Sequence, residues 1–176
     1  LKPDAILTDV GSTKGFIWSK LKQILPHDID YVAGHPMTGS EQSGIKAANA
    51  ELFRNKGYIL IPQTAKKEKS VKLVNELLKV TGANITTMGI EEHDAVAAVI
   101  SHVPHVVAAG LVNILGSAET DVDNKLKLAG GGFKDTTRIA SSNSDMWADI
   151  CISNADNIII ELEKLINIKL KEKGIK

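Results

Sequence analysis

Hydrophobic residues follow two patterns in the first half of the chain. Short continuous apolar runs predict β-strands over residues 5–10, 31–34 and 57–62, and the first run is of the kind found in a strand buried on both faces. One more short strand is expected over residues 84–89. Apolar residues recur every three or four positions over residues 17–25 and 71–78, which predicts helices, and a further helix is expected over residues 43–56. This alternation predicts an α/β domain over residues 1–89.

From about residue 90 the pattern is helical throughout. Residues 95–115 are rich in Ala and Val and carry few charges, so we predict a helix buried on most sides, in a core or at a subunit interface. Pro104 removes a backbone donor inside this helix and predicts a kink. A helical tail follows over residues 155–166. We expect residues 90–176 to form an all-helical domain whose excess apolar surface makes the protein a homodimer.

Composition excludes several classes of function. Lys+Arg and Asp+Glu both number 21, so bulk charge favours neither nucleic acid nor an anionic membrane. Cys151 is the single cysteine and cannot form an internal disulfide. We identify no stretch long and apolar enough to span a bilayer, and no signal peptide. We therefore expect a cytoplasmic protein with no nucleic-acid or membrane partner.

His35 stands where the second apolar run ends, in the segment Gly34-His35-Pro36. Pro36 holds the preceding residue extended, and the small residues nearby let a ligand approach the backbone. An imidazole in this position is a candidate proton acceptor near neutral pH. A histidine that only caps a tight turn remains an alternative.

Ser12 follows the first apolar run, in the glycine-flanked turn formed by residues 11–15. Ligands of open α/β sheets bind beyond the carboxyl ends of the strands, so Ser12 and His35 could line one crevice. Ser12 equally suits the N-cap of the helix that follows. Both interpretations remain open from the sequence.

Two further segments carry polar residues in unusual settings. His102 and His105 flank Pro104 in an apolar helix, and because an unpaired buried imidazole is costly we expect at least one of them to have a polar function. No third ligand accompanies this pair, so no metal is expected. Three glycines then precede Lys134 and Arg138, which lie four residues apart and would share a helical face suited to a carboxylate. An ion-paired helix start is the alternative there.

Four segments in this order resemble the prephenate dehydrogenase family of tyrosine biosynthesis. They are Asp9-Val10-Gly11-Ser12-Thr13-Lys14, Gly34-His35-Pro36-Met37-Thr38-Gly39, Ser101-His102-Val103-Pro104-His105 and the stretch from Gly131 to Ala140. The resemblance implies the C-terminal portion of a dinucleotide-binding, Rossmann-like α/β domain followed by an all-α dimerisation domain. It also implies NAD-dependent oxidative decarboxylation of prephenate to 4-hydroxyphenylpyruvate.

The resemblance further implies roles for individual residues. His35 would accept the proton of the ring hydroxyl as hydride leaves for NAD, and Ser12 would orient His35. Gly11 and Ser12 would contact the cofactor. The substrate pocket would be lined by His102, Arg138, Lys134, Asp135, Trp147 and Ser40, with Glu41 as a neighbouring secondary residue. Among these, Arg138 would hold a substrate carboxylate with support from Lys134.

One expected feature of such enzymes is absent from the sequence. No Gly-x-Gly-x-x-Gly fingerprint follows a strand in these 176 residues, and no acidic ribose ligand follows it. We therefore expect the intact protein to carry an N-terminal nucleotide-binding half, and the present residues alone to bind NAD poorly or not at all.

Three alternatives remain open. Arogenate could replace prephenate as substrate, since the two differ only in an amino or keto group of the side chain. The chain could instead be a non-catalytic helical dimerisation piece. A Ser/His hydrolase that uses Ser12 and His35 is the third alternative, but the sequence shows neither a nucleophile-elbow motif nor a clear acidic third member.

Overall fold

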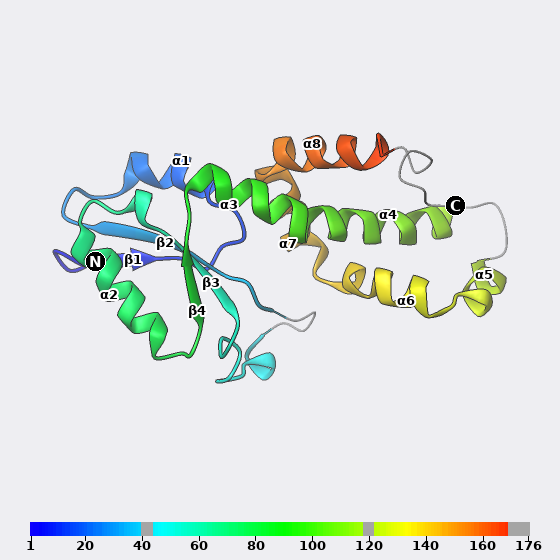
Figure 1. The fold of residues 1–176 in the computed structure, drawn as a ribbon, viewed down its shortest axis with the longest axis horizontal. Coiled ribbons are helices and arrows are strands. Elements are labelled where there is room, and N and C mark those ends of the chain that lie inside the picture. Colours follow the sequence, from blue (N-terminus) through cyan, green and yellow to red (C-terminus); the bar gives the residue numbers. More distant parts are fainter. Residues whose placement is uncertain (40–43, 118–121, 169–176) are drawn as a thin grey trace. The chain divides into compact units, whose positions relative to one another are not determined.

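The computed structural model describes residues 1–39, 44–117 and 122–168. The chain divides into two compact units, Leu1–Val96 and Ala97–Lys176, and each is described by itself. Strands lie in the first unit, and the second unit is helical over its described residues (Figure 1). The expected fold class, an α/β domain followed by an all-helical domain, is confirmed over the described residues.

The first unit is built on a mixed sheet in the order β1-β2-β3-β4. β1 pairs parallel with β2, β2 pairs antiparallel with β3, and β3 pairs parallel with β4. The elements are β1 (Ile6–Thr8), α1 (Gly15–Ile24), β2 (Asp30–Pro36), η1 (Ile45–Ala47), β3 (Gly57–Ile61), η2 (Pro62–Thr64), α2 (Glu68–Lys79), β4 (Asn84–Thr87) and α3 (Ile90–Ala97).

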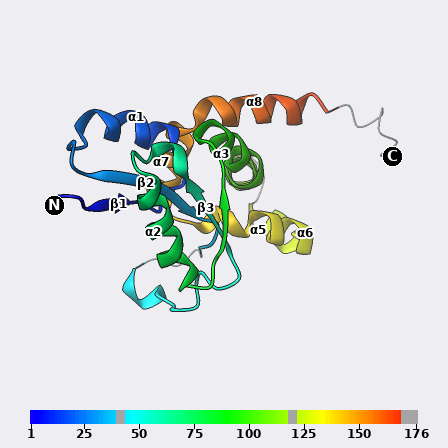
Figure 2. The same cartoon turned by 60° about the vertical axis from the view of Figure 1, so that its left-hand side comes forward.

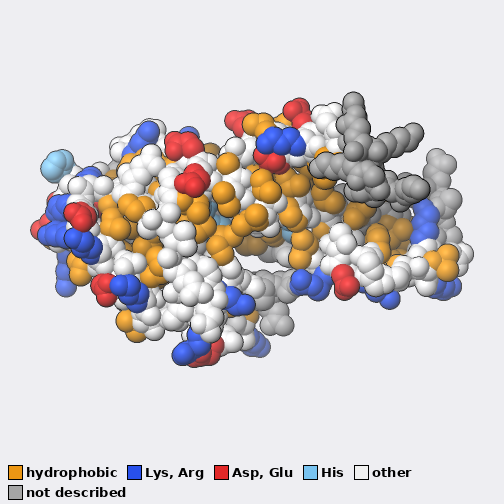
Figure 3. Space-filling view, in the orientation of Figure 1, with side chains coloured by type: hydrophobic (Ala, Val, Ile, Leu, Met, Phe, Trp, Pro, Cys, Tyr) orange, Lys and Arg blue, Asp and Glu red, His pale blue; other side chains and the backbone are white. Residues whose placement is uncertain are grey.

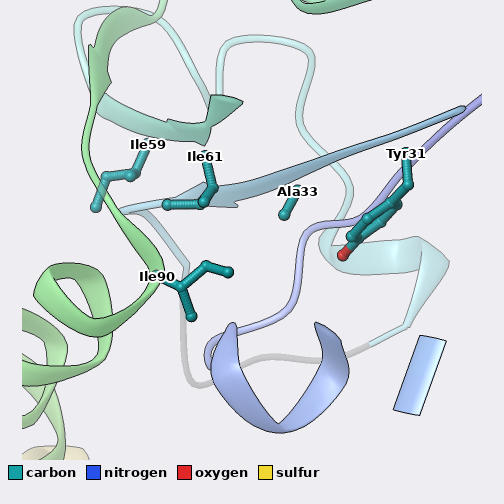
Figure 4. Packing of buried hydrophobic residues seen from close by; sticks show 5 residues of the cluster. All are labelled: Tyr31, Ala33, Ile59, Ile61 and Ile90. Carbon is teal, nitrogen blue, oxygen red and sulfur yellow. The ribbon is translucent and has the colours of Figure 1, made fainter. Parts of the chain in front are cut away.

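Helices cover both faces of this sheet (Figures 1 and 2). Successive residues of a strand point to opposite faces, so β2 and β3 each contribute to two cores. Tyr31, Ala33, Ile59, Ile61 and Ile90 form one core, shown in Figure 4, against which Trp18 and Leu21 of α1 pack. The other core joins Val32, Tyr58 and Leu60 to Val74 and Leu78 of α2. Packing on both faces therefore holds the central strands in place at the end of β2, where His35 lies.

Two local predictions for this unit are wrong. The helix expected over residues 43–56 is replaced, over its described part, by turns and the short 3₁₀ helix η1. Gly44 and Asn55 both have positive φ, at 82° and 58°, and Ile45 is 88% exposed, so no apolar face holds a helix on the core. β1 is half-buried rather than buried on both faces, because it lies at one end of the sheet.

The second unit consists of helical segments joined by short connections. They are η3 (Ala98–His102), α4 (Val103–Ser117), α5 (Val122–Leu128), α6 (Gly131–Thr137), η4 (Arg138–Ser141), α7 (Ser144–Ser153) and α8 (Ala155–Ile166). Its most buried apolar residues are Ala97, Ala98, Ala108, Ile150 and Ile158. Much of the apolar surface of α4 and α8 remains exposed, as at Ile114 (69%) and Ile166 (80%).

Pro104 does not end the helix; instead, the helical turn before it is widened. The segment η3, immediately before it, is π-helical, which is one way for a helix to accommodate an interrupted hydrogen-bond ladder. His102 ends this π-helical turn and is buried. The local distortion expected from the proline is thus present next to one of the two imidazoles singled out in the sequence.

Because Pro104 does not end the helix, the helical segment Ile90–Ser117 is long and apolar enough to cross a membrane by length and composition. The prediction that no such stretch exists is therefore wrong. Only 28% of its most apolar window is buried within the chain. A helix that packs against other protein passes the same test, so this property alone does not assign the segment to a membrane. Apolar side chains show at the surface over α4 in Figure 3.

Gly34 of β2 is a position where an added methyl group has no room. A Cβ there would lie 2.8 Å from Tyr58 Cε1 and 3.1 Å from the Asp9 carbonyl oxygen. We expect Gly34→Ala to lower the free energy of unfolding by about 1–3 kcal/mol, because overpacking forces neighbouring groups to shift. Urea denaturation measures the change. Gly57→Ala in β3 is the matched control, since its Cβ would meet Met37 at an ordinary 3.5 Å; equal losses in both variants would contradict the steric explanation.

Candidate active site

The loop after β1 is tied to the end of β2 through Asp9. Its Oδ1 accepts hydrogen bonds from the Gly34 amide at 3.0 Å and the Tyr31 hydroxyl at 2.9 Å. Its Oδ2 accepts from the Gly11 amide at 3.0 Å and from Lys14 Nζ at 2.5 Å. Lys14 Nζ also donates to the Gly34 carbonyl at 2.6 Å. The turn that carries Ser12 is therefore fixed beside the segment that carries His35, as expected for loops that follow two parallel neighbouring strands.

Asp9 and Lys14 form a buried ion pair, with the Lys14 side chain fully buried and that of Asp9 21% exposed. Burial favours the neutral carboxyl of Asp9, but the Lys14 ammonium and the hydrogen bonds outweigh it and hold the pKa of Asp9 below its usual value. Burial lowers the pKa of Lys14, and the attraction of Asp9 offsets only part of that effect.

His35 is held by a chain of hydrogen bonds that begins at the start of α3. His35 Nδ1 lies 2.8 Å from His93 Nε2, and His93 Nδ1 lies 2.8 Å from Asp94 Oδ1. His35 is 8% exposed and His93 is fully buried. The two rings are 5.0 Å apart between centroids and are tilted by 59°. His93 therefore fixes the orientation of the candidate base.

Asp94 also caps α1, a role for which Ser12 was one of the candidates. Its Oδ1 and Oδ2 accept from the amides of Lys14 and Gly15, each at 2.8 Å. Burial raises the pKa of Asp94, but the bonds from His93 and from these amides outweigh burial and lower it overall. The N-cap interpretation of Ser12 is wrong, because a carboxylate from another helix satisfies these amides first.

Ser12 and Gly11 keep their predicted places in the loop at the carboxyl end of β1. Both are half-buried, and Gly11 donates its amide to Asp9. His35 Nδ1 forms its hydrogen bond with His93 rather than with Ser12. The cofactor contacts predicted for Gly11 and Ser12, and the orienting role predicted for Ser12, stay predictions.

In the second unit, His102 is buried against Asn154, the residue between α7 and α8. Asn157 Nδ2 donates to Asn154 Oδ1 at 2.8 Å, which turns Asn154 Nδ2 toward His102 Nδ1 at 3.1 Å. His102 Nδ1 must then accept, so its neutral ring carries the proton on Nε2. Nε2 of His102 is therefore a hydrogen-bond donor.

His105 stacks on Trp147 in the same unit. The two rings are 3.5 Å apart between centroids and 3° from parallel, and His102 meets the same indole edge-on at 6.1 Å. Burial lowers the pKa of His105, which keeps the ring neutral at pH 7. Its Nδ1 is buried and has no hydrogen-bond partner among the described residues. An orphaned buried nitrogen of this kind is where a bound ligand would supply the missing partner.

The predicted carboxylate-binding residues lie on α6 and η4. Lys134, Asp135 and Arg138 are exposed, and Arg138 begins η4 directly after α6 ends at Thr137. Both cations are thus on consecutive helical turns of the second unit. Ser40 and its neighbour Glu41 lie outside the described residues, and their predicted roles stay predictions.

Three of the residues that build these sites were not chosen from the sequence. They are His93, Asp94 and Asn154. A His-Asp pair a few residues after a predicted strand was the available signal for the first two, whereas His105 was singled out with His102 but was given no place in the substrate pocket. Asn154 carried no local signal, because its partner lies 52 residues away.

Two family models match consecutive parts of the chain. Residues 1–87 match "Prephenate dehydrogenase, nucleotide-binding domain", and residues 90–172 match "Prephenate dehydrogenase, dimerization domain". Together the two matches leave out only residues 88, 89 and 173–176.

Individual relatives agree with these matches. A prephenate dehydrogenase of Bacillus subtilis is 43% identical over 94% of this chain and 45% of its own length. The A. aeolicus prephenate dehydrogenase, solved in complex with hydroxyphenyl propionate and NAD+, is 40% identical with a TM-score of 0.86, over 98% of this chain and 60% of that one. A Synechocystis arogenate dehydrogenase structure is 28% identical with a TM-score of 0.76, over 94% and 59%. The chain thus spans about half the length of these relatives.

Proposed function

Because the chain belongs to the prephenate dehydrogenase family, we propose that the full-length protein catalyses the NAD-dependent oxidative decarboxylation of prephenate to 4-hydroxyphenylpyruvate in tyrosine biosynthesis. The observation that carries the proposal is His35, a nearly buried imidazole at the carboxyl end of β2 whose Nδ1 is bonded to a second imidazole. A ring held in this way is suited to take one proton from one position.

In this proposal His35 accepts the proton of the ring hydroxyl as hydride leaves the same carbon. Loss of CO2 then makes the ring aromatic, which strongly favours this step, so the protein needs no separate group for decarboxylation. The Asp9 and Lys14 network holds the loop after β1 next to Gly34, the neighbour of His35. Ser12 lies on that loop, which follows the strand paired parallel with β2. The side chains thus position and deprotonate the substrate.

NAD supplies the hydride acceptor when it is bound. The chain's own residues suit the nicotinamide end of such a cofactor, because the Gly11-Ser12 turn follows the carboxyl end of β1, where open α/β sheets bind nucleotides. Gly11 and Ser12 are the residues we assign to this contact. The match of residues 1–87 to a nucleotide-binding domain supports the assignment.

The substrate's two carboxylates call for cationic partners, since desolvating them against neutral groups would be costly. We assign this role to Arg138, supported by Lys134, with Asp135 steadying both cations. His102 would donate from Nε2, and Trp147 would close the pocket. Ser40 would add a polar contact. His105 joins this set because of its orphaned Nδ1 and its stacking on Trp147.

We further propose a cytoplasmic homodimer formed through the helical domain. The match to a dimerization domain supports it, as does the exposed apolar surface of α8, where Ile159 is 52% exposed and Ile166 80%. We take residues 1–89 and 90–176 as the two domains. Assembly of two copies would cover apolar surface that the chain by itself leaves open.

The proposal is tested by NADH formation at the reduced-nicotinamide absorbance band, with full-length protein, NAD and either prephenate or arogenate. We expect turnover of prephenate at a rate that depends on NAD. Arogenate is the second candidate substrate because a structural relative is an arogenate dehydrogenase. A higher kcat/KM for arogenate would reassign the substrate, and no NADH from either compound would refute the activity.

A further inference from the structure

We propose that His93 and Asp94 are positioning residues that lock the neutral His35 ring in the tautomer protonated at Nδ1, so that Nε2 carries the lone pair that takes the substrate proton. The inference rests on the proposed function for its catalytic meaning. The hydrogen-bond chain that carries it is a property of the first unit alone.

The chain begins at a group that can only accept. Asp94 takes hydrogen bonds from two backbone amides at the start of α1, and an amide nitrogen can only donate. The positive end of the α1 dipole also favours a carboxylate at this place. The bonds to Asp94 favour its ionised form, as the lowered pKa of its carboxyl shows. An ionised Asp94 requires a donor at His93 Nδ1.

The protonation of His93 in turn determines the protonation of His35. With its proton on Nδ1, neutral His93 has a lone pair on Nε2, which lies 2.8 Å from His35 Nδ1. His35 Nδ1 must then carry a proton, because two facing lone pairs would repel. A neutral imidazole holds only one proton, so His35 Nε2 is the basic nitrogen.

Burial makes this arrangement specific. His93 is 0% exposed, so the protein rather than bulk water satisfies its two nitrogens. A ring with its proton on the wrong nitrogen cannot act as a base even when it is correctly placed, which is why a carboxylate behind a catalytic histidine has a large effect in other enzymes. His93 serves here as the link between that carboxylate and the base.

The first test reads the tautomer directly. In full-length protein labelled with ¹⁵N at histidine, and above the titration of His35, we expect a pyrrole-type resonance at His35 Nδ1 and a pyridine-type resonance at Nε2. His35→Asn assigns the pair of signals by removing them. A pyridine-type Nδ1 in the wild-type protein would overturn the proposal, whatever reaction the protein catalyses.

The second test compares two substitutions at His93. Leucine fills the space without an acceptor, whereas glutamine can turn its amide oxygen to His35 and its NH₂ group to Asp94. We expect His93→Leu to lower kcat for prephenate oxidation by about 10- to 100-fold with little change in KM, and to remove the fixed ¹⁵N pattern. We expect His93→Gln to retain kcat within about threefold, because it keeps the acceptor.

Equal loss of kcat in both variants, with both folded by circular dichroism, would show that the acceptor is not what matters and would overturn the proposal. Unchanged kcat in His93→Leu would do the same. If no variant and no wild-type protein forms NADH, the proposed function fails, while the ¹⁵N measurement still decides the tautomer. The two failures are therefore distinguishable.

Discussion

His35→Asn lowers kcat for prephenate oxidation by about 10²–10⁴-fold in the full-length protein, the range expected when a general base is removed. Asparagine has no lone pair basic enough to take the hydroxyl proton, yet its short polar side chain can stay within the nearly buried site at the end of β2. KM changes much less than kcat, since the proton is transferred only as the reaction proceeds. Stopped-flow or steady-state NADH absorbance measures both constants.

His27→Asn is the matched control for this substitution. His27 is exposed in the turn before β2, so the same chemical change there leaves kcat unaltered. Circular dichroism and thermal unfolding check that His35→Asn keeps the native fold. A folded His35→Asn protein with kcat within about threefold of wild type would remove His35 from the mechanism.

Lys14→Met gives the largest expected loss of stability. It removes the ammonium from a fully buried side chain and leaves the Asp9 carboxylate without its cation, although Asp9 still accepts bonds from Gly34, Gly11 and Tyr31. Breaking one partner out of a buried ion pair costs about 3–5 kcal/mol, because the remaining charge is uncompensated. Chemical denaturation followed by circular dichroism measures the free energy of unfolding.

Two further variants test the cause of that loss. Lys72→Met breaks an exposed ion pair with Glu68 on α2 and leaves stability nearly unchanged. Combining Lys14→Met with Asp9→Asn removes both charges, so the double variant loses less than the sum of the two single losses. Strict additivity would mean that lost packing of the lysine stem, rather than the unpaired carboxylate, explains the effect.

Local sequence pattern was sufficient for most elements of the fold but not for their pairing. Apolar runs identify β2 and β3 because side chains on a buried sheet must be apolar wherever they face a helix. The antiparallel pairing of β2 with β3 depends on how the chain returns after residue 36, which no periodicity encodes. The same segment misled the helix prediction over residues 43–56, where exposed Ile45 and the positive φ of Asn55 belong to a turn-rich connection.

The candidate site was only partly visible in the sequence for a related reason. His35 could be chosen because a proline and a strand end mark its place. His93 meets it from 58 residues away, and Asp94 reaches the Lys14 amide across 80 residues, so only the folded sheet brings them together. Ser12 was a sound N-cap candidate on local grounds, and a distant carboxylate that offers two oxygens displaced it.

Asp94 joins two tasks that are usually separate, because one carboxylate both starts α1 and ends the hydrogen-bond chain to His35. Fraying of the first turn of α1 would free the carboxylate, and the freed carboxylate would no longer dictate which nitrogen of the neighbouring rings is protonated. Disorder at the start of α1 and loss of the fixed tautomer of His35 would then occur together. The integrity of α1 thereby becomes a condition for the reactivity of His35 at the end of β2.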